Sequence, residues 1–323
     1  MVAVEVVTVT GEREDEYDVV VIGGGAAGLN GALMLARARR RVLVIDAGAP
    51  RNAPAAAVHG LLGRDGMAPG ELLERGRDEV RRYGGQVTVA SVVSAAREDG
   101  GFAVTLAGGR VVRARRLLVA TGLTDELPDV PGLRDRWGRD VVHCPYCHGW
   151  EVRDRAIGVL ASGPRSVHQA LLFRQLSDDV LYFANSVPLT GPEAEQLAAR
   201  GIRVVDGDVA SLEIAGDRLT GIRLRDGTTE PREVVAIAPR MVARAGVLAA
   251  LGLHPVEHPS GAGTWVPADP AGRTEVPGVW VAGNVTDLAA QVGTAAAGGA
   301  MAGAVINADL VEEETRAAMA AAL

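Results

Sequence analysis

The amino-acid sequence predicts an α/β fold with two doubly wound parallel sheets, the second inserted into the first. Residues 18–46 follow the order strand, glycine-rich turn, helix and strand, and residues 156–183 repeat that order. A further strand and turn at 276–284 indicate that the first sheet resumes near the C-terminus. We therefore expect the chain to leave the first domain near residue 126 and to return to it near residue 245.

The domain boundaries follow from these patterns. We expect a first domain of residues 16–125 and 246–323, an inserted domain of residues 126–245, and a flexible N-terminal tail of residues 1–15. The tail is acidic and has no long apolar core, which argues against a signal peptide. No apolar run approaches the roughly 20 residues of a membrane helix. The sequence therefore predicts a cytoplasmic protein that has no membrane partner.

The charge balance argues against polyanionic partners. The 323 residues include 33 basic and 40 acidic side chains, for a formal net charge of −7, and every basic side chain is arginine. An acidic chain with scattered arginines lacks the basic face that nucleic acids and anionic membranes require. The absence of lysine excludes Schiff-base catalysis and a phosphate-binding lysine.

The first glycine turn has the spacing of a dinucleotide site. Gly23 permits the tight turn, Gly25 lets the backbone approach a pyrophosphate, and Gly28 allows the helix to pack closely on the strand. The helix N-terminus then faces the phosphates with its partial positive charge. Asp46 ends the next strand, where an acid accepts hydrogen bonds from the adenosine ribose. The turn, helix and acid together predict a Rossmann-like nucleotide-binding fold.

The two cysteines, Cys144 and Cys147, form a Cys-Pro-Tyr-Cys segment inside the expected insertion. In a reducing compartment a lone pair at this spacing is more often catalytic than structural. At the start of a helix such a pair closes a disulfide without backbone movement, and the helix end lowers the thiolate pKa. A zinc site that adds His143 and His148 is the alternative. Adjacent ligands point apart, however, so we expect no metal.

In this order the elements resemble the small flavin-containing thioredoxin reductases over residues 17–310. Besides the first glycine turn and the cysteine pair, two motifs carry the resemblance: Ala120-Thr121-Gly122, and Gly283-Asn284 followed by Gln291-Val292. The resemblance implies two Rossmann-like folds, FAD in the first domain, and a homodimer joined mainly through that domain. It also implies that Cys147 lies next to the flavin and that Cys144 exchanges with the sulfur of the substrate.

The resemblance further implies a set of FAD-binding residues, in which the glycine turn and Asp46 hold the ADP half and later loops contact the ribityl chain or the flavin. The set is Gly23, Gly25, Ala26, Ala27, Gly28, Asp46, Arg51, Asn52, His59, Val92, Thr121, Gly122, Gly283, Asn284, Gln291 and Val292. His59 either faces the flavin or is simply solvated. Asn284 replaces the family's usual aspartate, which removes a charge but keeps a hydrogen-bonding amide for the ribityl chain. A helix that starts near Thr294 points its N-terminus at the flavin.

The second glycine turn departs from the family pattern. It reads Ala161-Ser162-Gly163-Pro164-Arg165-Ser166, so two of the three close-approach positions carry a Cβ, and the proline removes a backbone N–H. After the next strand, Ala184-Asn185-Ser186 stands where the family binds the 2′-phosphate of NADPH with basic residues. Only Arg165 or Arg174 could substitute for them. These changes disfavour NADPH binding in the inserted domain.

His148 follows Cys147 directly, at the position where the reductases carry an acid. A histidine accepts a thiol proton near neutral pH, which an aspartate does poorly, so we expect His148 to be the base. Glu151 is expected to orient His148 or to stabilise its charge. The expected catalytic set is therefore Cys144, Cys147, His148 and Glu151.

The segment Cys-Pro-Tyr-Cys-His-Gly-Trp-Glu and the altered second turn resemble the FAD-dependent dithiol oxidases that close disulfides in natural products of the gliotoxin and holomycin type. This resemblance implies that a small-molecule dithiol reduces the cysteine disulfide, that FAD receives the electrons, and that O2 reoxidises FAD to give peroxide. Two alternatives remain. One is a thioredoxin reductase that uses NADPH or another electron donor, and the other is a non-catalytic redox sensor.

Overall fold

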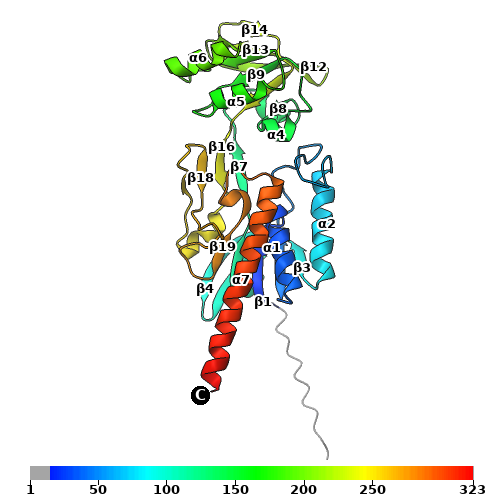
Figure 1. Ribbon diagram of the computed structural model, residues 1–323, viewed down its shortest axis with the longest axis vertical. Helices are drawn as coiled ribbons and strands as arrows, with labels where there is room; N and C mark the ends of the chain where they lie inside the picture. The colour runs from blue at the N-terminus through cyan, green and yellow to red at the C-terminus, as the bar shows by residue number, and fades with distance from the viewer. Residues whose placement is uncertain (1–14, 323) are drawn as a thin grey trace, which may run out of the picture.

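The computed structural model describes residues 15–322, so most of the predicted tail, residues 1–14, lies outside the described part of the chain. Two lobes are stacked along the long axis of the molecule (Figure 1). Between them run two strands, β7 (Leu123–Glu126) and β16 (Arg240–Ala243). The predicted fold class is confirmed, because each lobe contains a parallel sheet and the second lobe interrupts the chain of the first.

The larger lobe is built on a seven-stranded sheet in the order β3-β2-β1-β6-β5-β4, with β19 pairing to β6 as well. Its strands are β1 (Glu16–Ile22), β2 (Val42–Asp46), β3 (Gln86–Val89), β4 (Val92–Glu98), β5 (Gly101–Leu106), β6 (Val111–Val119) and β19 (Val279–Val281). All pairs are parallel except β4 with β5 and β5 with β6. β1 is central because its inner residues, 19–21, are apolar and fully buried.

Three long helices cover this sheet: α1 (Ala26–Arg37), α2 (Pro69–Arg82) and α7 (Val292–Ala321). α7 lies along α1 (Figure 1). Small residues allow that approach, since a Cβ on Gly299 would lie 1.9 Å from the carbonyl oxygen of Ala27, and one on Gly303 would lie 2.6 Å from that of Gly31. α7 begins at Val292, two residues before the predicted start near Thr294.

By length and composition alone, α7 is the one helix in residues 15–322 that could cross a membrane. In this fold the apolar composition of α7 is explained by its packing on the larger lobe. Small and apolar residues face α1 and the sheet, and the buried ones are Gly299, Ala302, Gly303, Ile306 and Leu310.

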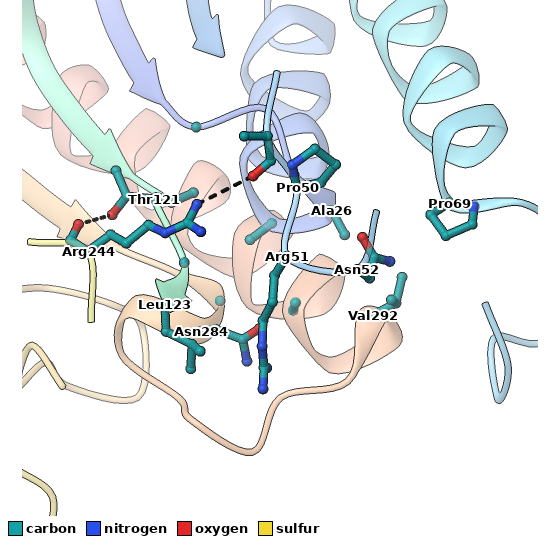
Figure 2. Close-up of a pocket in the computed structure, with 18 of the residues that line it drawn as sticks. Ala26, Pro50, Arg51, Asn52, Pro69, Thr121, Leu123, Arg244, Asn284 and Val292 are labelled. Atoms are coloured by element: carbon teal, nitrogen blue, oxygen red, sulfur yellow. Dashed lines mark hydrogen bonds between the residues drawn. The ribbon is translucent and has the colours of Figure 1, made fainter. Parts of the chain in front are cut away.

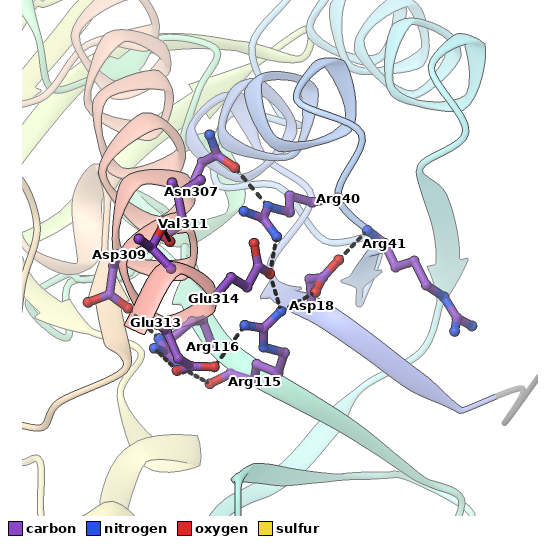
Figure 3. A network of polar contacts seen from close by, with 11 residues as sticks. Asp18, Arg40, Arg41, Arg115, Arg116, Asn307, Asp309, Val311, Glu313 and Glu314 are labelled. Carbon is purple, nitrogen blue, oxygen red and sulfur yellow. Dashed lines mark hydrogen bonds and ion pairs between the residues drawn. The ribbon is translucent and has the colours of Figure 1, made fainter. Parts of the chain in front are cut away.

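The acidic end of α7, residues 312–314, is paired with arginines of the sheet. Arg115, on β6, pairs with Glu313 and Glu314 at 2.7 Å each, and Arg116 reaches Asp309 at 2.6 Å (Figure 3). Each exposed pair contributes little by itself, about 0–1 kcal/mol. Because several carboxylates share two neighbouring arginines, the network fixes the helix end against the sheet.

The smaller lobe is built on a parallel five-stranded sheet in the order β11-β10-β9-β15-β8. Its strands are β8 (Val141–Val142), β9 (Ile157–Leu160), β10 (Val180–Phe183), β11 (Arg203–Val205) and β15 (Val234–Ile237). The helices are α3 (Leu133–Arg136), α4 (Pro145–His148), α5 (Ser166–Phe173) and α6 (Gly191–Ala199), and an antiparallel sheet comprises β12 (Val209–Ala215), β13 (Arg218–Leu224) and β14 (Thr229–Glu230). The side chains of Phe173, Tyr182 and Phe183 are almost fully buried in this lobe.

The link between the lobes locates the domain boundaries. β7 pairs antiparallel with β16, and β16 pairs with β18 (Gly263–Trp265), which pairs with β17 (Val256–Glu257). Two short 3-10 helices follow in the larger lobe: Gly246–Leu251 contacts β4, and Gly283–Val285 contacts α7. The chain leaves the larger lobe after β7, which ends at Glu126, and returns in β16, which shares its sheet with β7 and β18 rather than with the inserted sheet.

Candidate active site

A cavity of about 680 Å³ extends from the first glycine turn to the cysteine pair. In the larger lobe it lies where β1, β6 and β19 end, which is the carboxyl edge of a parallel sheet. Figure 2 shows part of its lining, with Asn52 and Val292 near each other and Arg51 beside Asn284. The predicted residues that line it are Gly23, Gly25, Ala26, Ala27, Asp46, Arg51, Asn52, His59, Val92, Thr121, Gly122, Cys144, Cys147, His148, Gly283, Asn284, Gln291 and Val292. Gly28 and Glu151 lie outside it.

The three glycines of the first turn meet different surroundings. Gly23 has φ +108°, and a Cβ there would lie 2.3 Å from the carbonyl oxygen of Ala120. A Cβ on Gly28 would lie 1.8 Å from the carbonyl oxygen of Gly23, so the close contact of helix and strand requires glycine. A Cβ on Gly25 would have no protein atom within 4 Å, because this position opens onto the cavity.

Two helix N-termini meet the cavity without internal partners. Gly25 caps α1 and Gln291 caps α7, and neither cap accepts a side-chain hydrogen bond. Neither first turn contains an acid, so the backbone N–H groups are available to an anion. Asp46 stands opposite the first turn at the end of β2, held by Arg77 at 3.2 Å. A pyrophosphate at α1, a ribose at Asp46 and a flavin near α7 fit this donor set, so the cavity suits FAD.

Arg51 brings a positive charge to the far end of the cavity. Its Nε and one Nη each donate to Asp125 at 2.7 Å, and the Asp125 side chain is only 7% exposed. The other Nη is 3.5 Å from Oδ1 of Asn284. The Asn284 amide nitrogen donates to the backbone oxygens of Asp287 and Ala290 at 2.9 Å each. Since the nitrogen is occupied, only Oδ1 of Asn284 remains for a ribityl hydroxyl.

The cysteines sit at the start of α4, directly after β8, and both face the cavity. Cys144 is the N-cap of the helix and Cys147 lies within its single turn. The pKa of Cys144 is lowered to about 7, mainly by a hydrogen bond from the Cys147 thiol and further by backbone N–H groups and the charge of Arg51. The pKa of Cys147 is raised, because its proton is shared with the neighbouring sulfur and it is buried. Gln291 Nε2 lies 4.0 Å from Cys144 Sγ.

His148 lines the cavity beside Cys147, and Glu151 does not orient its ring through a hydrogen bond. Both ring nitrogens of His148 are buried without a hydrogen-bond partner. Burial lowers its pKa, and the charge of Glu151 only partly opposes this. Glu151 Oε1 lies instead 3.4 Å from His59 Nε2, and His59 Nδ1 lies 3.4 Å from Asp65. His59 thus joins a loop of the larger lobe to the cysteine segment of the smaller lobe.

His143 stays neutral at physiological pH. Its pKa is lowered to about 4, first by burial and then by the charge of Arg51. Its backbone oxygen accepts a hydrogen bond from Gln169 at 2.6 Å. Within residues 15–322, no three His, Cys, Asp or Glu side chains are grouped so that they could hold a metal ion.

Residues 17–302 match the model of the Pyridine nucleotide-disulphide oxidoreductase family. The chain belongs to this family. Its members bind FAD, so the enzyme is a FAD-dependent disulfide oxidoreductase, in agreement with the cavity and the cysteine pair described above.

Relatives in this family match almost the full chain. "Thioredoxin reductase sirT" of Leptosphaeria maculans is 31% identical over 309 residues, which cover 90% of this chain and 93% of that protein. "Thioredoxin reductase tcpT" of Claviceps purpurea is 30% identical and covers 92% and 95%. The crystal structure of HlmI has a TM-score of 0.89 at 48% identity, and covers 96% of this chain and 97% of the other.

In this oxidoreductase the second glycine turn is closed by its own residues. The fully buried Ser166 hydroxyl accepts the backbone N–H groups of Ser162 at 3.0 Å and Gly163 at 3.3 Å. These N–H groups are therefore not free for a pyrophosphate. Arg174, one of the two predicted substitutes for the basic cluster, pairs with Asp178.

The end of β10 is closed as well. Asn185 donates to the carbonyl oxygen of Ala161 at 3.3 Å and accepts from the N–H of Val209 at 3.0 Å. Ser186 donates to the carboxylate of Asp208. An acid thus stands close to the place where the family binds the 2′-phosphate, and a phosphate would be repelled there.

Sequence reasoning missed several residues that shape the site. Asp125 carried no motif, although it lies on the predicted boundary and neutralises Arg51. Pro54 contacts the insertion, since a Cβ on Gly138 would lie 2.7 Å from Pro54 Cβ. Arg244 crosses the link, accepting from Thr121 on its backbone oxygen and donating to that of Ala49 (Figure 2). No local signal could have paired these distant segments.

Proposed function

We propose that the enzyme is a dithiol oxidase that closes an intramolecular disulfide in a small-molecule dithiol, with O2 as the final acceptor and without NADPH. One contrast carries the proposal. The cysteine pair opens onto the cavity that suits FAD, whereas the second nucleotide turn uses its N–H groups on Ser166. In an enzyme that has the cysteine pair and the flavin site but no NADPH site, electrons flow from the dithiol to oxygen.

The cysteines divide the exchange between them. A substrate thiolate attacks Cys144 of the disulfide, a mixed disulfide forms, and Cys147 leaves as a thiol. The second substrate sulfur then displaces Cys144, which releases the cyclic disulfide and leaves two electrons and two protons on the enzyme. The lowered pKa makes Cys144 the better leaving group in that step. When bound in the cavity, FAD would supply the two-electron acceptor for the reduced cysteine pair and the link to O2, whose two-electron reduction product is H2O2.

His148 serves as the base in this exchange. The residue lines the cavity beside the cysteines, its ring nitrogens have no hydrogen-bond partner, and burial keeps the ring neutral and able to accept a thiol proton. Activity should therefore be low at pH values below the lowered pKa of His148, where the ring is protonated. It should rise as the pH increases through that pKa.

We expect His148→Ala to lower kcat by about 10²-fold and to remove the acidic limb of the pH–rate profile. The matched control is His168→Ala, because His168 is exposed on α5, away from the cavity. Steady-state rates measured between pH 5 and 9 test whether His148 is the base. An unchanged acidic limb in the His148 variant would remove histidine from this role.

Oxygen uptake tests the proposed reaction. With dithiothreitol as a simple dithiol, we expect one O2 consumed and one H2O2 formed for each disulfide closed. With NADPH alone we expect only background uptake. The relatives bear the name thioredoxin reductase, which keeps that activity as the second candidate. NADPH-driven reduction of thioredoxin at a rate that matches or exceeds dithiol oxidation would establish it instead.

We further propose a cytoplasmic homodimer joined through α7, with a role in small-molecule biosynthesis. The exposed face of α7 presents small and apolar residues at alternating spacings of four and three: Ala297, Met301, Ala304, Ala308 and Val311. This is the repeat of a helix seam. Met301 is 54% and Val311 47% exposed, so two large apolar side chains of this seam face solvent in the monomer.

The double variant Met301→Glu/Val311→Glu is expected to convert the dimer to a monomer, because four carboxylates would face one another across the seam. Light scattering at micromolar concentration measures the mass. Glu312→Gln on the same helix is the control. A double variant that keeps the mass of a dimer would place the interface elsewhere.

A further inference from the structure

Among residues 15–322, one arginine in the wall of the cavity that suits FAD is not neutralised by an acid. Apart from histidines, the charged residues of this wall are Asp46, Arg51, Asp125 and Arg244. Arg51 is paired with Asp125 at 2.7 Å, and Asp46 with Arg77 at 3.2 Å. In the described part of the chain, the guanidinium of Arg244 has only a threonine hydroxyl and a backbone oxygen as acceptors. The cavity therefore presents an uncompensated cation to a bound molecule.

The backbone of Arg244 is fixed beside the first glycine turn. Its N–H donates to the carbonyl oxygen of Gly122 at 3.0 Å, and its own carbonyl oxygen accepts from the Thr121 hydroxyl at 2.6 Å. Thr121 borders the glycine turn, since a Cβ on Gly23 would lie 3.1 Å from the backbone nitrogen of Thr121. The side chain of Arg244 therefore starts close to the glycines that are suited to a pyrophosphate.

From there the side chain of Arg244 crosses the end of β1. Its Nε donates to Thr124 Oγ1 at 3.0 Å, and one Nη donates to the carbonyl oxygen of Ala49 at 3.4 Å. Ala49 lies in the loop after β2, and Thr124 lies in β7, which follows β6. β2 and β6 are the two neighbours of β1 in the sheet. A side chain that runs between the segments after these strands therefore passes over the turn after β1 (Figure 2).

We propose that Arg244 binds the pyrophosphate of FAD and closes the cofactor site from the side of the link. The pyrophosphate carries two negative charges, and the first turn of α1 contributes only backbone N–H groups to it. The chain contains no lysine, and acids already hold Arg51 and Arg77. A guanidinium presents two parallel donors to the oxygens of a phosphate, so Arg244 supplies the missing charge.

The present contacts of Arg244 leave its guanidinium able to take this role. Within residues 15–322 its second Nη makes no hydrogen bond, and the bond to Ala49 is long. A charged phosphate oxygen is a stronger acceptor than a neutral carbonyl. The bond from Nε to Thr124 leaves both Nη groups on the side of the glycine turn and the loop after β2. Arg244 thus acts as a strap across the cofactor site.

Release of FAD from the holoenzyme, followed by the fluorescence of free flavin after dilution, tests the strap. Arg244→Met is expected to release FAD about tenfold faster than the wild type, and Arg244→Lys to fall between them, because lysine keeps the charge but loses the paired donors. Arg240→Met is the matched control, since Arg240 is exposed on β16 and pairs with Glu126 and Glu257 outside the cavity. It should release FAD at the wild-type rate.

A second measurement separates binding of the pyrophosphate from a merely structural role. ADP and adenosine share one nucleoside, but only ADP contains the pyrophosphate. In competition with FAD for the apoprotein, Arg244→Met should weaken ADP about tenfold and leave adenosine unchanged. The inference is overturned if Arg244→Met releases FAD at the wild-type rate, or if it weakens ADP and adenosine by the same factor. Neither measurement involves turnover, so both are independent of the proposed dithiol oxidation.

Discussion

Replacing Cys147 with serine abolishes dithiol oxidation, with a loss in kcat of about 10³-fold or more. The variant keeps Cys144 at the N-cap of α4 but cannot form the enzyme disulfide that a substrate thiolate attacks, so no oxidant is available to the dithiol at this site. The flavin content should stay at the wild-type level, since the ADP half is held at the first glycine turn, far along the cavity.

Two measurements separate this expectation from simple damage. Intact mass after treatment with 2-hydroxyethyl disulfide, which has no second thiol to reverse the exchange, should show one covalent adduct on Cys147→Ser and none on the Cys144→Ser/Cys147→Ser double variant. Turnover of Cys147→Ser at the wild-type rate would show that the disulfide is not part of the reaction.

The second large effect concerns the glycine that faces the cavity. Gly25→Val should lower the affinity for FAD by about a hundredfold or more, which corresponds to roughly 3 kcal/mol. The reason is geometric, because the new side chain meets no protein atom and instead fills the space that the pyrophosphate needs. The backbone at Gly25 has φ −79°, which valine adopts without strain.

The apoprotein of Gly25→Val should therefore melt at the wild-type Tm. Gly28→Val is the contrasting variant, since its side chain would collide with the carbonyl oxygen of Gly23 and disturb the fold itself. Gly70→Val is the neutral control, because Gly70 is exposed on α2 with no atom near its Cβ position. Flavin titration and thermal melting of apoprotein measure the two quantities. Wild-type flavin affinity in Gly25→Val would mean that the cofactor lies elsewhere.

Local pattern was enough to predict the elements that build the site. The first turn could be read in detail because its glycine spacing is a local pattern, and Gly28 meets its constraint, the carbonyl oxygen of Gly23, within the same βαβ unit. The cysteine pair could be placed at a helix start because proline follows Cys144 directly. Family resemblance added the distant polar residues, such as Asn284 and Gln291, which line the same cavity.

Contacts between segments far apart in the chain could not be predicted. Glu151 was expected to serve His148, its near neighbour, yet it contacts His59 from the other lobe. Arg51 finds Asp125 across the link, and the acids of α7 find the arginines of β6. The hydroxyl that closes the second turn belongs to Ser166, whose residue type alone gives no such indication. For Glu151, Arg51 and the acids of α7, tertiary geometry rather than spacing selects the partner.

The most direct test of the account is anaerobic rapid mixing of the purified flavoprotein with NADPH and, separately, with a simple dithiol, followed by oxygen. We predict that the dithiol bleaches the flavin absorbance, that NADPH does not, and that oxygen restores the absorbance with release of peroxide. Bleaching by NADPH within milliseconds would contradict the account, and would show that the closed second turn still binds the nucleotide and that the enzyme is a disulfide reductase.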